Sequence, residues 1–401
     1  MQSNGIQNEW INWSGSIRFN PKTIEMPHDE NDLKQLVSKA IAENINIRTV
    51  GSSHSCSRIF ETKDILISME RFKSIVAVDG ANLKATVGAG MTVEEIGEEL
   101  FEHGLGLENT GHINKQTIAG AISTGTHGAG KNLPNMSGQV VGLKMITGTG
   151  EQQEFNIESH AEIMQALKVS LGSMGLITEV QLRVLPAFKL RRIQYCASLS
   201  DCLNHLDEMM NTHRNFCFYW YPRRDDVSLR TWNFEDDVKK VIPFGKIYKE
   251  YSGWGKDVLP THHELKYNEL EYSVDASAAV SCFQEIRKRV LAKHRKIVGW
   301  RILFRPIAKD DVFLSNSYGR NTVAITIHQN ASLPYKEYFE DIESVFKAHG
   351  GRPHWGKKHS MNASELKKVY PMWNQFQKIR QEMDPHGIFL NAYLKRVFIE
   401  E

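Results

Sequence analysis

The sequence has few cysteines, and none of them is placed to form a metal site or a disulfide framework. The 401 residues contain five cysteines, scattered and odd in number. No two of them form a Cys-x-x-Cys pair, which argues against a zinc ribbon. We therefore expect a reducing, cytoplasmic location.

The chain also lacks long apolar runs and an excess of charge of one sign. No run approaches the length of a membrane span, and the N-terminus has no charged start followed by an apolar core. We expect neither a membrane span nor a signal peptide. The formal net charge is only +2, and nucleic acid is not expected as a partner, because binding it needs a clustered basic excess.

What is present is typical of a globular protein with two domains. Hydrophobic residues make up 41% of the chain and charged residues 24%, which is ordinary for a large core with a solvated surface. Up to about residue 185 short strands alternate with helices. From about 190, aromatic and β-branched strands broken by helices predict a mostly antiparallel sheet covered by helices.

Apolar spacing and turn signals predict individual elements. A helix is expected at about 30–44, and Thr92 with Glu95 forms a capping box for a second helix that Gly104 ends. Further helices are expected near 199–211, 275–293 and 335–348. Strands are expected at 45–50, 65–68, 75–79, 84–87, 216–222, 227–232, 300–306 and 322–328.

The strand–Gly-Ala-Gly–helix segment at 84–101 looks at first like a dinucleotide fingerprint. Val93 occupies the third glycine position, where close packing of the helix needs Gly or Ala. The acidic residue expected about twenty positions later has no clear strand before it. A plain connection between a strand and a helix is the better interpretation.

Residues 48–55, Arg-Thr-Val-Gly-Ser-Ser-His-Ser, join a strand end to a turn of small residues that holds His54. A backbone without bulky side chains can approach a pyrophosphate and donate N–H groups to it. Alone, such a turn more often has no ligand. Two later segments support a ligand-binding role for this turn.

The first of these is 118–130, Ile-Ala-Gly-Ala-Ile-Ser-Thr-Gly-Thr-His-Gly-Ala-Gly. Four glycines, with three β-branched residues between them, make it a poor helix interior, and it suits a place where backbone lies close to a flat or charged ligand. His127 either contacts that ligand or is hydrogen-bonded to hold the loop.

The second is 354–359, His-Trp-Gly-Lys-Lys-His, where Lys357 would be a fixed cation if buried. His354 and His359 belong to no recognisable metal motif, and no carboxylate is placed in the sequence to complete a site with them. We therefore expect no metal.

These segments resemble the vanillyl-alcohol-oxidase type, or PCMH type, of FAD enzyme, in the branch of sugar-1,4-lactone oxidases and alditol oxidases. Residues 48–55 are similar to a V-G-x-x-H-S turn, and residues 117–130 are similar to the other flavin loop. Residues 352–359 and 384–394 resemble the C-terminal signature. Four matches in the right order over nearly the whole chain are strongly specific.

The resemblance implies an α+β fold with three parts: a two-subdomain FAD-binding domain at 1–188, a substrate domain at 189–350, and a segment at 351–401 that returns to the active site. It implies FAD bonded through its 8α-methyl to His54. It also implies a set of further cofactor-binding residues: Val50, Gly51, Ser52, Ser53, Ser55, Thr117, Gly120, Ser123, Thr124, Gly125, Thr126, His127, Gly128, Ile177, Asn391 and Tyr393.

The chain departs from the family pattern at two positions. The family's Glu-x-Arg pair keeps Arg305, but Leu303 stands in place of the glutamate. His112 stands where lactone oxidases tend to have an acidic residue. Both changes fall where substrate hydroxyls would be held, so they put the substrate in doubt more than the redox chemistry.

The implied activity is oxidation of a CH–OH group of an alditol or aldono-1,4-lactone, by hydride transfer to flavin N5 and reduction of O₂ to H₂O₂. A fixed cation stabilises negative charge on the reduced flavin or on the developing alkoxide, and Lys357 and Arg305 are the candidates. His112 or His328 is the candidate acceptor of the hydroxyl proton. Gly111 lies where a small residue lets oxygen reach the flavin.

Several alternatives stay open. A dehydrogenase of the same fold would pass electrons to a quinone or cytochrome. Leu303 makes an oxidase for a non-lactone alcohol, or a flavin-binding protein without turnover, conceivable. The C-terminal signature argues against a reductase like those that act on enolpyruvyl sugars. Neither the substrate nor the oligomeric state is specified by these patterns.

Overall fold

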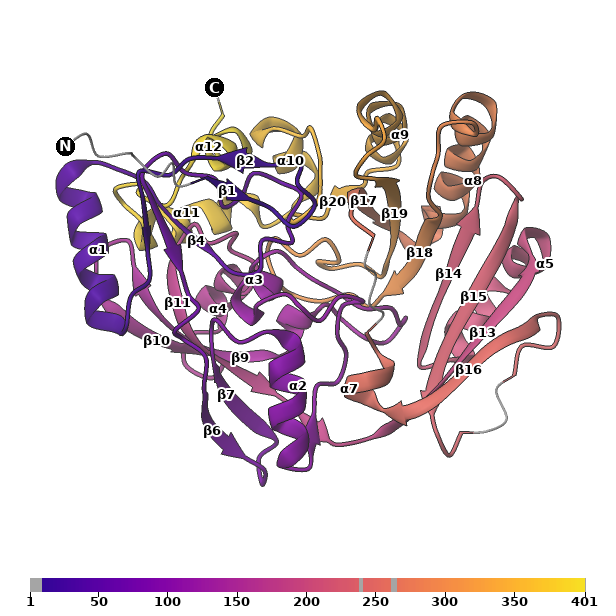
Figure 1. Cartoon of the computed structure of the whole chain (residues 1–401), viewed down its shortest axis with the longest axis horizontal. Coiled ribbons are helices and arrows are strands. Elements are labelled where there is room, and N and C mark those ends of the chain that lie inside the picture. The colour runs from indigo at the N-terminus through magenta and orange to yellow at the C-terminus, as the bar shows by residue number, and fades with distance from the viewer. Residues whose placement is uncertain (1–8, 238–240, 261–264, 401) are drawn as a thin grey trace, which may run out of the picture.

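The computed structural model describes residues 9–237, 241–260 and 265–400, and it has two sides (Figure 1). One side holds the N-terminal half of the chain, and the other is built around a large sheet from its middle. The last helices, coloured yellow in Figure 1, lie against the N-terminal side. Among the described residues, every helix is too short or too polar to span a bilayer.

The N-terminal side contains a parallel three-stranded sheet and an antiparallel five-stranded sheet, with strand orders β3-β5-β4 and β10-β9-β11-β7-β6. Their strands are β3 (Thr23–Glu25), β4 (Ile47–Val50), β5 (Ile65–Ser68), β6 (Ile75–Asp79), β7 (Lys84–Gly88), β9 (Val140–Thr147), β10 (Gln152–Asn156) and β11 (Gly175–Arg183). Two short pairs, β1 (Trp10–Ile11) with β2 (Arg18–Phe19) and β8 (Leu105–Gly106) with β12 (Leu185–Pro186), complete this side.

The first two helices begin and end where the sequence predicts. In α1 (Glu30–Glu43), Asp29 accepts hydrogen bonds from two backbone N–H groups of the first turn, and left-handed Asn44 ends the helix. In α2 (Val93–Glu102), the capping box is present, and Gly104 follows with a φ of +70°. Both helices bury one apolar face, as their spacing requires.

The other side is an eight-stranded sheet of order β16-β13-β15-β14-β18-β19-β17-β20, whose neighbours all pair antiparallel. Its strands are β13 (Lys189–Ser198), β14 (Asn215–Tyr221), β15 (Asp226–Phe234), β16 (Lys246–Trp254), β17 (Tyr267–Asp275), β18 (Ile302–Ile307), β19 (Thr322–Asn330) and β20 (Arg352–Pro353). The four strands expected here are confirmed as β14, β15, β18 and β19, while β13, β16, β17 and β20 were not expected.

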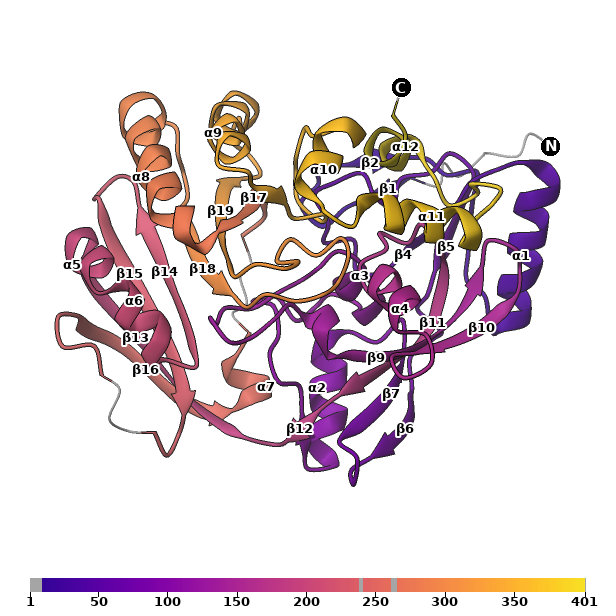
Figure 2. The same ribbon diagram turned by 180° about the vertical axis from the view of Figure 1, so that it is seen from behind.

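Helices cover one face of this sheet. They are α5 (Leu199–Asn204), α6 (Leu206–Thr212), α8 (Ala279–Arg289) and α9 (Lys336–Ala348), and all four lie on the outer side of the strands in Figure 2. Phe283 of α8 packs edge-on against Phe218 and Phe304 of adjacent strands. Because successive side chains of a strand alternate between faces, the neighbours of these aromatic residues point to the opposite face, toward the N-terminal side.

The remaining helices are α3 (Ile118–Ser123), α4 (Ala161–Leu167), α7 (Gly255–Val258), α10 (Ala363–Val369), α11 (Trp373–Met383) and α12 (Ala392–Phe398). Short non-α turns lie at η1 (Met136–Gln139), η2 (Ala276–Ala278) and η3 (Val290–His294), the last a π-helix. Helix α3 differs from expectation, since its glycine-rich sequence predicts a poor helix. It is a single short helix whose side chains Ile118, Ala121 and Ile122 are buried, so tertiary packing outweighs low intrinsic propensity.

The C-terminal segment packs on the N-terminal side. Helix α11 contacts α4, and the buried Arg48 of β4 donates hydrogen bonds to the backbone oxygens of Phe389, Gly172 and Leu171. Burial lowers the pKa of Arg48 to about 9. These contacts tie the chain end to the first sheet, although the domain boundaries at 188 and 350 stay predictions.

Candidate active site

The segments around His54 and α3 together line a cavity of about 110 Å³. A Cβ atom added to Gly51 would collide with the Thr117 side chain, so the two segments can approach this closely only because residue 51 has no side chain. Of the predicted cofactor-binding residues, those that line this cavity are Val50, Gly51, Ser52, Ser53, His54, Ser55, Thr117, Gly120, Ser123, Thr124 and Ile177.

A second cavity, of about 70 Å³, shares His54 and Gln116 with the first. The predicted residues that line it are His54, Gly111, His112, Thr126, His127, Arg305, His328 and Lys357. The structure therefore brings every predicted catalytic residue to one place. His54 belongs to both cavities, and its ring lies 5.2 Å from that of Trp13.

Two parts of the chain distant in sequence hold the His54 turn. On one side, the Trp13 backbone N–H donates to Ser53 O. On the other, Cys56 N–H donates to Gly356 O, and Ser57 Oγ donates to Trp355 O at 2.7 Å. The His-Trp-Gly-Lys segment thus lies directly beside the turn.

The large sheet contributes the wall of the second cavity through its register. Leu303 of β18 lies opposite Tyr219 of β14 and Thr326 of β19. Glu269 of β17 lies opposite His328 of β19. Residues opposite each other in an antiparallel pair point to the same face, so these side chains all point away from the covering helices.

Glu269 is the carboxylate at the centre of this wall. It forms an ion pair with Lys357, and its Oε1 lies 3.1 Å from His328 Nε2. Lys358 N–H donates to Glu269 O, so the C-terminal segment lies beside β17. This contact places Lys357 within reach of the Glu269 side chain. Burial lowers the pKa of Lys357 from its usual value.

His328 has both ring nitrogens engaged, since its Nδ1 also lies 3.1 Å from Arg301 O. Burial, with Arg301 adding to it, lowers the pKa of His328 to about 3. Such an imidazole is a weak base. His112, on the other side of the cavity, has its Nδ1 3.3 Å from Tyr219 Oη.

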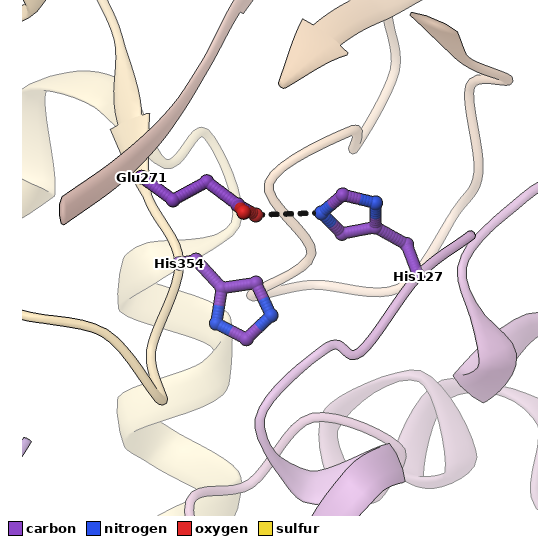
Figure 3. A group of neighbouring side chains, drawn as sticks. All are labelled: His127, Glu271 and His354. Atoms are coloured by element: carbon purple, nitrogen blue, oxygen red, sulfur yellow. Dashed lines mark hydrogen bonds and ion pairs between the residues drawn. The ribbon is translucent and has the colours of Figure 1, made fainter. Parts of the chain in front are cut away.

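A second buried group consists of His127, Glu271 and His354 (Figure 3), and its two histidines also line the second cavity. Glu271 Oε1 lies 2.7 Å from His127 Nε2, and Glu271 Oε2 accepts from Arg305 Nη2 at 2.6 Å. Burial alone would raise the pKa of Glu271, but Arg305 and His127 hold it well below its usual value. Burial lowers the pKa of His354 to about 4 and that of His127 below its usual value.

The same three residues each offer one metal-ligand atom, and these atoms lie within 4.8 Å of one another (Figure 3). The argument that no carboxylate is placed near His354 is therefore wrong, because β17 brings Glu271 to it. However, Arg305 already balances the charge of Glu271, and Thr326 also donates to this carboxylate at 2.6 Å. These contacts indicate a closed hydrogen-bonded network, and the absence of a metal stays a prediction.

Four predicted residues line neither cavity. Gly125 has a φ of +69° in the turn after α3, and a Cβ on Gly128 would lie 2.5 Å from Thr110 O. Asn391 caps α12 and donates to backbone oxygens of residues 58, 59 and 61. Tyr393 Oη lies 2.7 Å from His359 Nε2. Asn391 thus joins α12 to residues 58–61, and Tyr393 joins α12 to the segment that holds His359.

A larger cavity lies elsewhere. It measures about 440 Å³, between α2 and α7, with Phe101 and Trp254 in its walls, and none of the predicted site residues lines it. The shared position of His54 between the two smaller cavities is the better guide to the chemistry.

Several residues of the site were missed from the sequence. Glu269, Glu271 and Tyr267 lie on β17, which was not expected, although the alternation Glu-Leu-Glu-Tyr-Ser-Val at 269–274 is a strand pattern that could have identified it. Trp13, Tyr219, Trp300 and Arg301 also line the second cavity. No local signal distinguishes them from ordinary core residues.

Two family models match the chain. The model described as "D-arabinono-1,4-lactone oxidase" matches residues 180–251 and 243–397, and the model "FAD binding domain" matches residues 21–156. The second match includes the His54 turn and the glycine-rich segment of the first cavity.

Known relatives align over almost the full length. The chain is 30% identical to L-gulono-1,4-lactone dehydrogenase of Mycobacterium tuberculosis, over 97% of this chain and 98% of the relative. It is 27% identical to L-gulonolactone oxidase of Mus musculus, over 98% of each. Among solved structures, cholesterol oxidase of Brevibacterium sterolicum superposes with a TM-score of 0.85 at 15% identity, covering 98% of this chain and 97% of that one. That likeness confirms the α+β, PCMH-type fold.

Proposed function

Because the chain belongs to the D-arabinono-1,4-lactone oxidase family, we propose that it oxidises the CH–OH group of a sugar-derived alcohol, with FAD as cofactor and O₂ as electron acceptor. The substrate class is an aldono-1,4-lactone or an alditol. The observation that carries the proposal is the joining of two cavities at His54. One is lined by small residues of the FAD-binding domain, and the other by Arg305, Lys357 and five histidines.

The residues of the first cavity fit FAD. Gly51 stands where any side chain would collide with Thr117 of the other loop, so the two loops can approach each other closely around the cofactor. Ser52, Ser53 and Ser55 add hydroxyl groups that can donate to phosphate oxygens. When bound, FAD supplies hydride acceptance at N5.

The second cavity has a distinct role for each polar side chain. Lys357 and Arg305 are cations that stabilise negative charge on the flavin ring or on the substrate oxygen as its proton leaves. His112 is the acceptor of the hydroxyl proton, since both nitrogens of His328 are engaged and its pKa is lowered to about 3. An efficient base has a pKa near the working pH, which disfavours His328.

His54 holds the cofactor by a covalent bond to its 8α-methyl group. Its position between the cavities, fixed by the N-terminal segment and by residues 355–356, supports this role. The bond prevents loss of the cofactor and keeps the ring in one orientation against the substrate.

Oxygen is the proposed acceptor because the cavity wall has no side chain at Gly111. A Cβ atom there would collide with Thr126 Cγ2, so a larger residue would have to displace the Thr126 side chain, which lines the same cavity. A dehydrogenase that uses a quinone or cytochrome is the second candidate, favoured by the name of the mycobacterial relative.

The test is turnover by the pure holoenzyme on a panel of aldono-1,4-lactones, alditols and simple secondary alcohols. Oxygen consumption and H₂O₂ are measured together, and we expect one peroxide per oxygen with a lactone or alditol. Turnover that needs an added quinone or dye would identify a dehydrogenase instead. Consumption of NADPH would identify a reductase, and a lack of turnover on the whole panel would contradict the proposal.

A further inference from the structure

The wall of the second cavity is rich in hydrogen-bond donors and poor in acceptors. Its cations are Arg301, Arg305 and Lys357. Within the part of the chain that the structure describes, Glu269 is the one carboxylate that lines this cavity. Its residue is 6% exposed, and that small exposed part borders the cavity.

The two known partners of Glu269 leave part of its bonding capacity unused. Lys357 contacts Oε2 and His328 Nε2 lies near Oε1. An ionised carboxylate only accepts hydrogen bonds and has about four lone-pair sites on its two oxygens. The two partners therefore account for about half of these sites, and the others can accept from a molecule in the cavity.

Glu269 supplies a carboxylate to the cavity wall in which Leu303 replaces the glutamate of the family pattern. Leu303 lies on β18 and Glu269 on β17, with β19 between them, and both are in the register that points to the cavity. Two strand spacings separate them by about 10 Å. A carboxylate is thus present at the substrate end of the site, on a different strand from the one expected.

We propose that Glu269 is the residue that binds the hydroxyl groups of the substrate, and that the ion pair with Lys357 and the contact with His328 hold its carboxylate in place for this. The inference rests on the proposed function and assigns the acceptor side of the same site. It commits the enzyme to neutral substrates with hydroxyl donors next to the carbon that is oxidised. An alcohol without a second hydroxyl lacks the donor that Glu269 binds.

The experiment compares the holoenzyme with its Glu269→Gln and Glu269→Asp variants. Each is assayed on the best substrate of the panel and on deoxy analogues that lack one hydroxyl each. Glu343→Gln is the matched control, because Glu343 is also buried but contacts Tyr272 and Ser360 outside the cavity. Substrate binding to the oxidised holoenzyme is measured by calorimetry, and flavin content and melting temperature show whether each variant is folded.

A hydrogen bond to a charged acceptor leads us to expect a KM and a dissociation constant raised about 10- to 100-fold in Glu269→Gln. We expect kcat to fall less than tenfold, and the deoxy analogue that lacks the bound hydroxyl to lose little further affinity in the variant. Glu269→Asp should recover part of the affinity, and Glu343→Gln should bind as the native enzyme does.

Equal losses of affinity for every analogue, or a KM within twofold of the native value in a folded Glu269→Gln, would overturn the assignment while the proposed function stands. If the native enzyme turns over or binds no member of the panel, both proposals are wrong. Turnover and binding by the native enzyme therefore distinguish failure of the proposed function from failure of the Glu269 assignment.

Discussion

The bond from His54 to the flavin is a property of one residue and is tested by its replacement. In His54→Ala we expect FAD to bind without the covalent link, because the first cavity keeps its other lining residues. Acid precipitation should leave yellow colour in the pellet of the native protein and release it to the supernatant from the variant. His103→Ala, at the exposed end of α2, is the control and should retain the colour. Release of FAD from the native protein would refute the bond.

The proton acceptor is a second property of one residue. Removing a positioned base costs about 10²–10⁴-fold in rate, so we expect His112→Ala to lower the rate of substrate oxidation by at least 100-fold. Anaerobic mixing with substrate, followed by flavin absorbance, measures this step apart from reoxidation. His205→Ala, an exposed histidine before α6, is the control. A loss under about tenfold would assign the role to another group.

Strand β17 is the element on which the site depends most. Its alternate residues Glu269 and Glu271 point to the site, while Leu270 and Tyr272 are buried on the other face. Glu271 also links His127 of the glycine-rich segment to Arg305 of β18. One strand therefore positions two cations of the second cavity and also His127 of the glycine-rich segment.

Replacing Glu271 by Gln leaves Arg305 buried without its counter-charge. Removing one partner of a buried ion pair costs about 3–5 kcal/mol of unfolding free energy, so we expect Glu271→Gln to lose that much at pH 7 by denaturant unfolding of the holoprotein. Glu343→Gln, whose contacts are a tyrosine hydroxyl and a backbone N–H, should lose less.

The loss should also depend on pH. The pKa of Glu271 in the fold lies well below its usual value of 4.5, because of Arg305 and His127. Its contribution is thus complete above 4.5 and is lost as pH falls toward the pKa in the folded protein. The difference between Glu271→Gln and the native protein should shrink below about pH 4. A difference independent of pH, or one no larger than that of Glu343→Gln, would contradict this account.

At the scale of the whole molecule, the site lies where three parts of the chain meet. The N-terminal side contributes the glycine-lined cavity, the large sheet contributes one polar face, and the C-terminal segment lies against both. Gly130 N–H donates to Pro306 O, and His354 N–H donates to Glu271 O, which joins each neighbouring part to the sheet. The longer helices α8 and α9 lie on the other face of the sheet (Figures 1 and 2), while the short α7 packs beside the site, against β13 and β16.

Much of this could be predicted from local sequence. The caps of α1 and α2, the strands with aromatic and β-branched residues, and the small-residue turn at His54 are local features, because each depends on neighbours within a few positions. Strand β17 was missed because its cavity-facing positions are glutamates, which are uncommon in strands. Helix α3 was missed because glycine lowers helix propensity and only packing around Ile118 and Ile122 compensates.

The sequence by itself determined the fold class, the FAD cofactor and many residues of the site, since these follow from short motifs and from their order along the chain. Only the tertiary structure decided which of them act together. It placed Glu269 between Lys357 and His328, and Glu271 between His127 and Arg305. The physical reason has two parts: strand pairing turns Glu269, Glu271 and His328 to one face, and loops that pack on this face bring Lys357 and His127 to it.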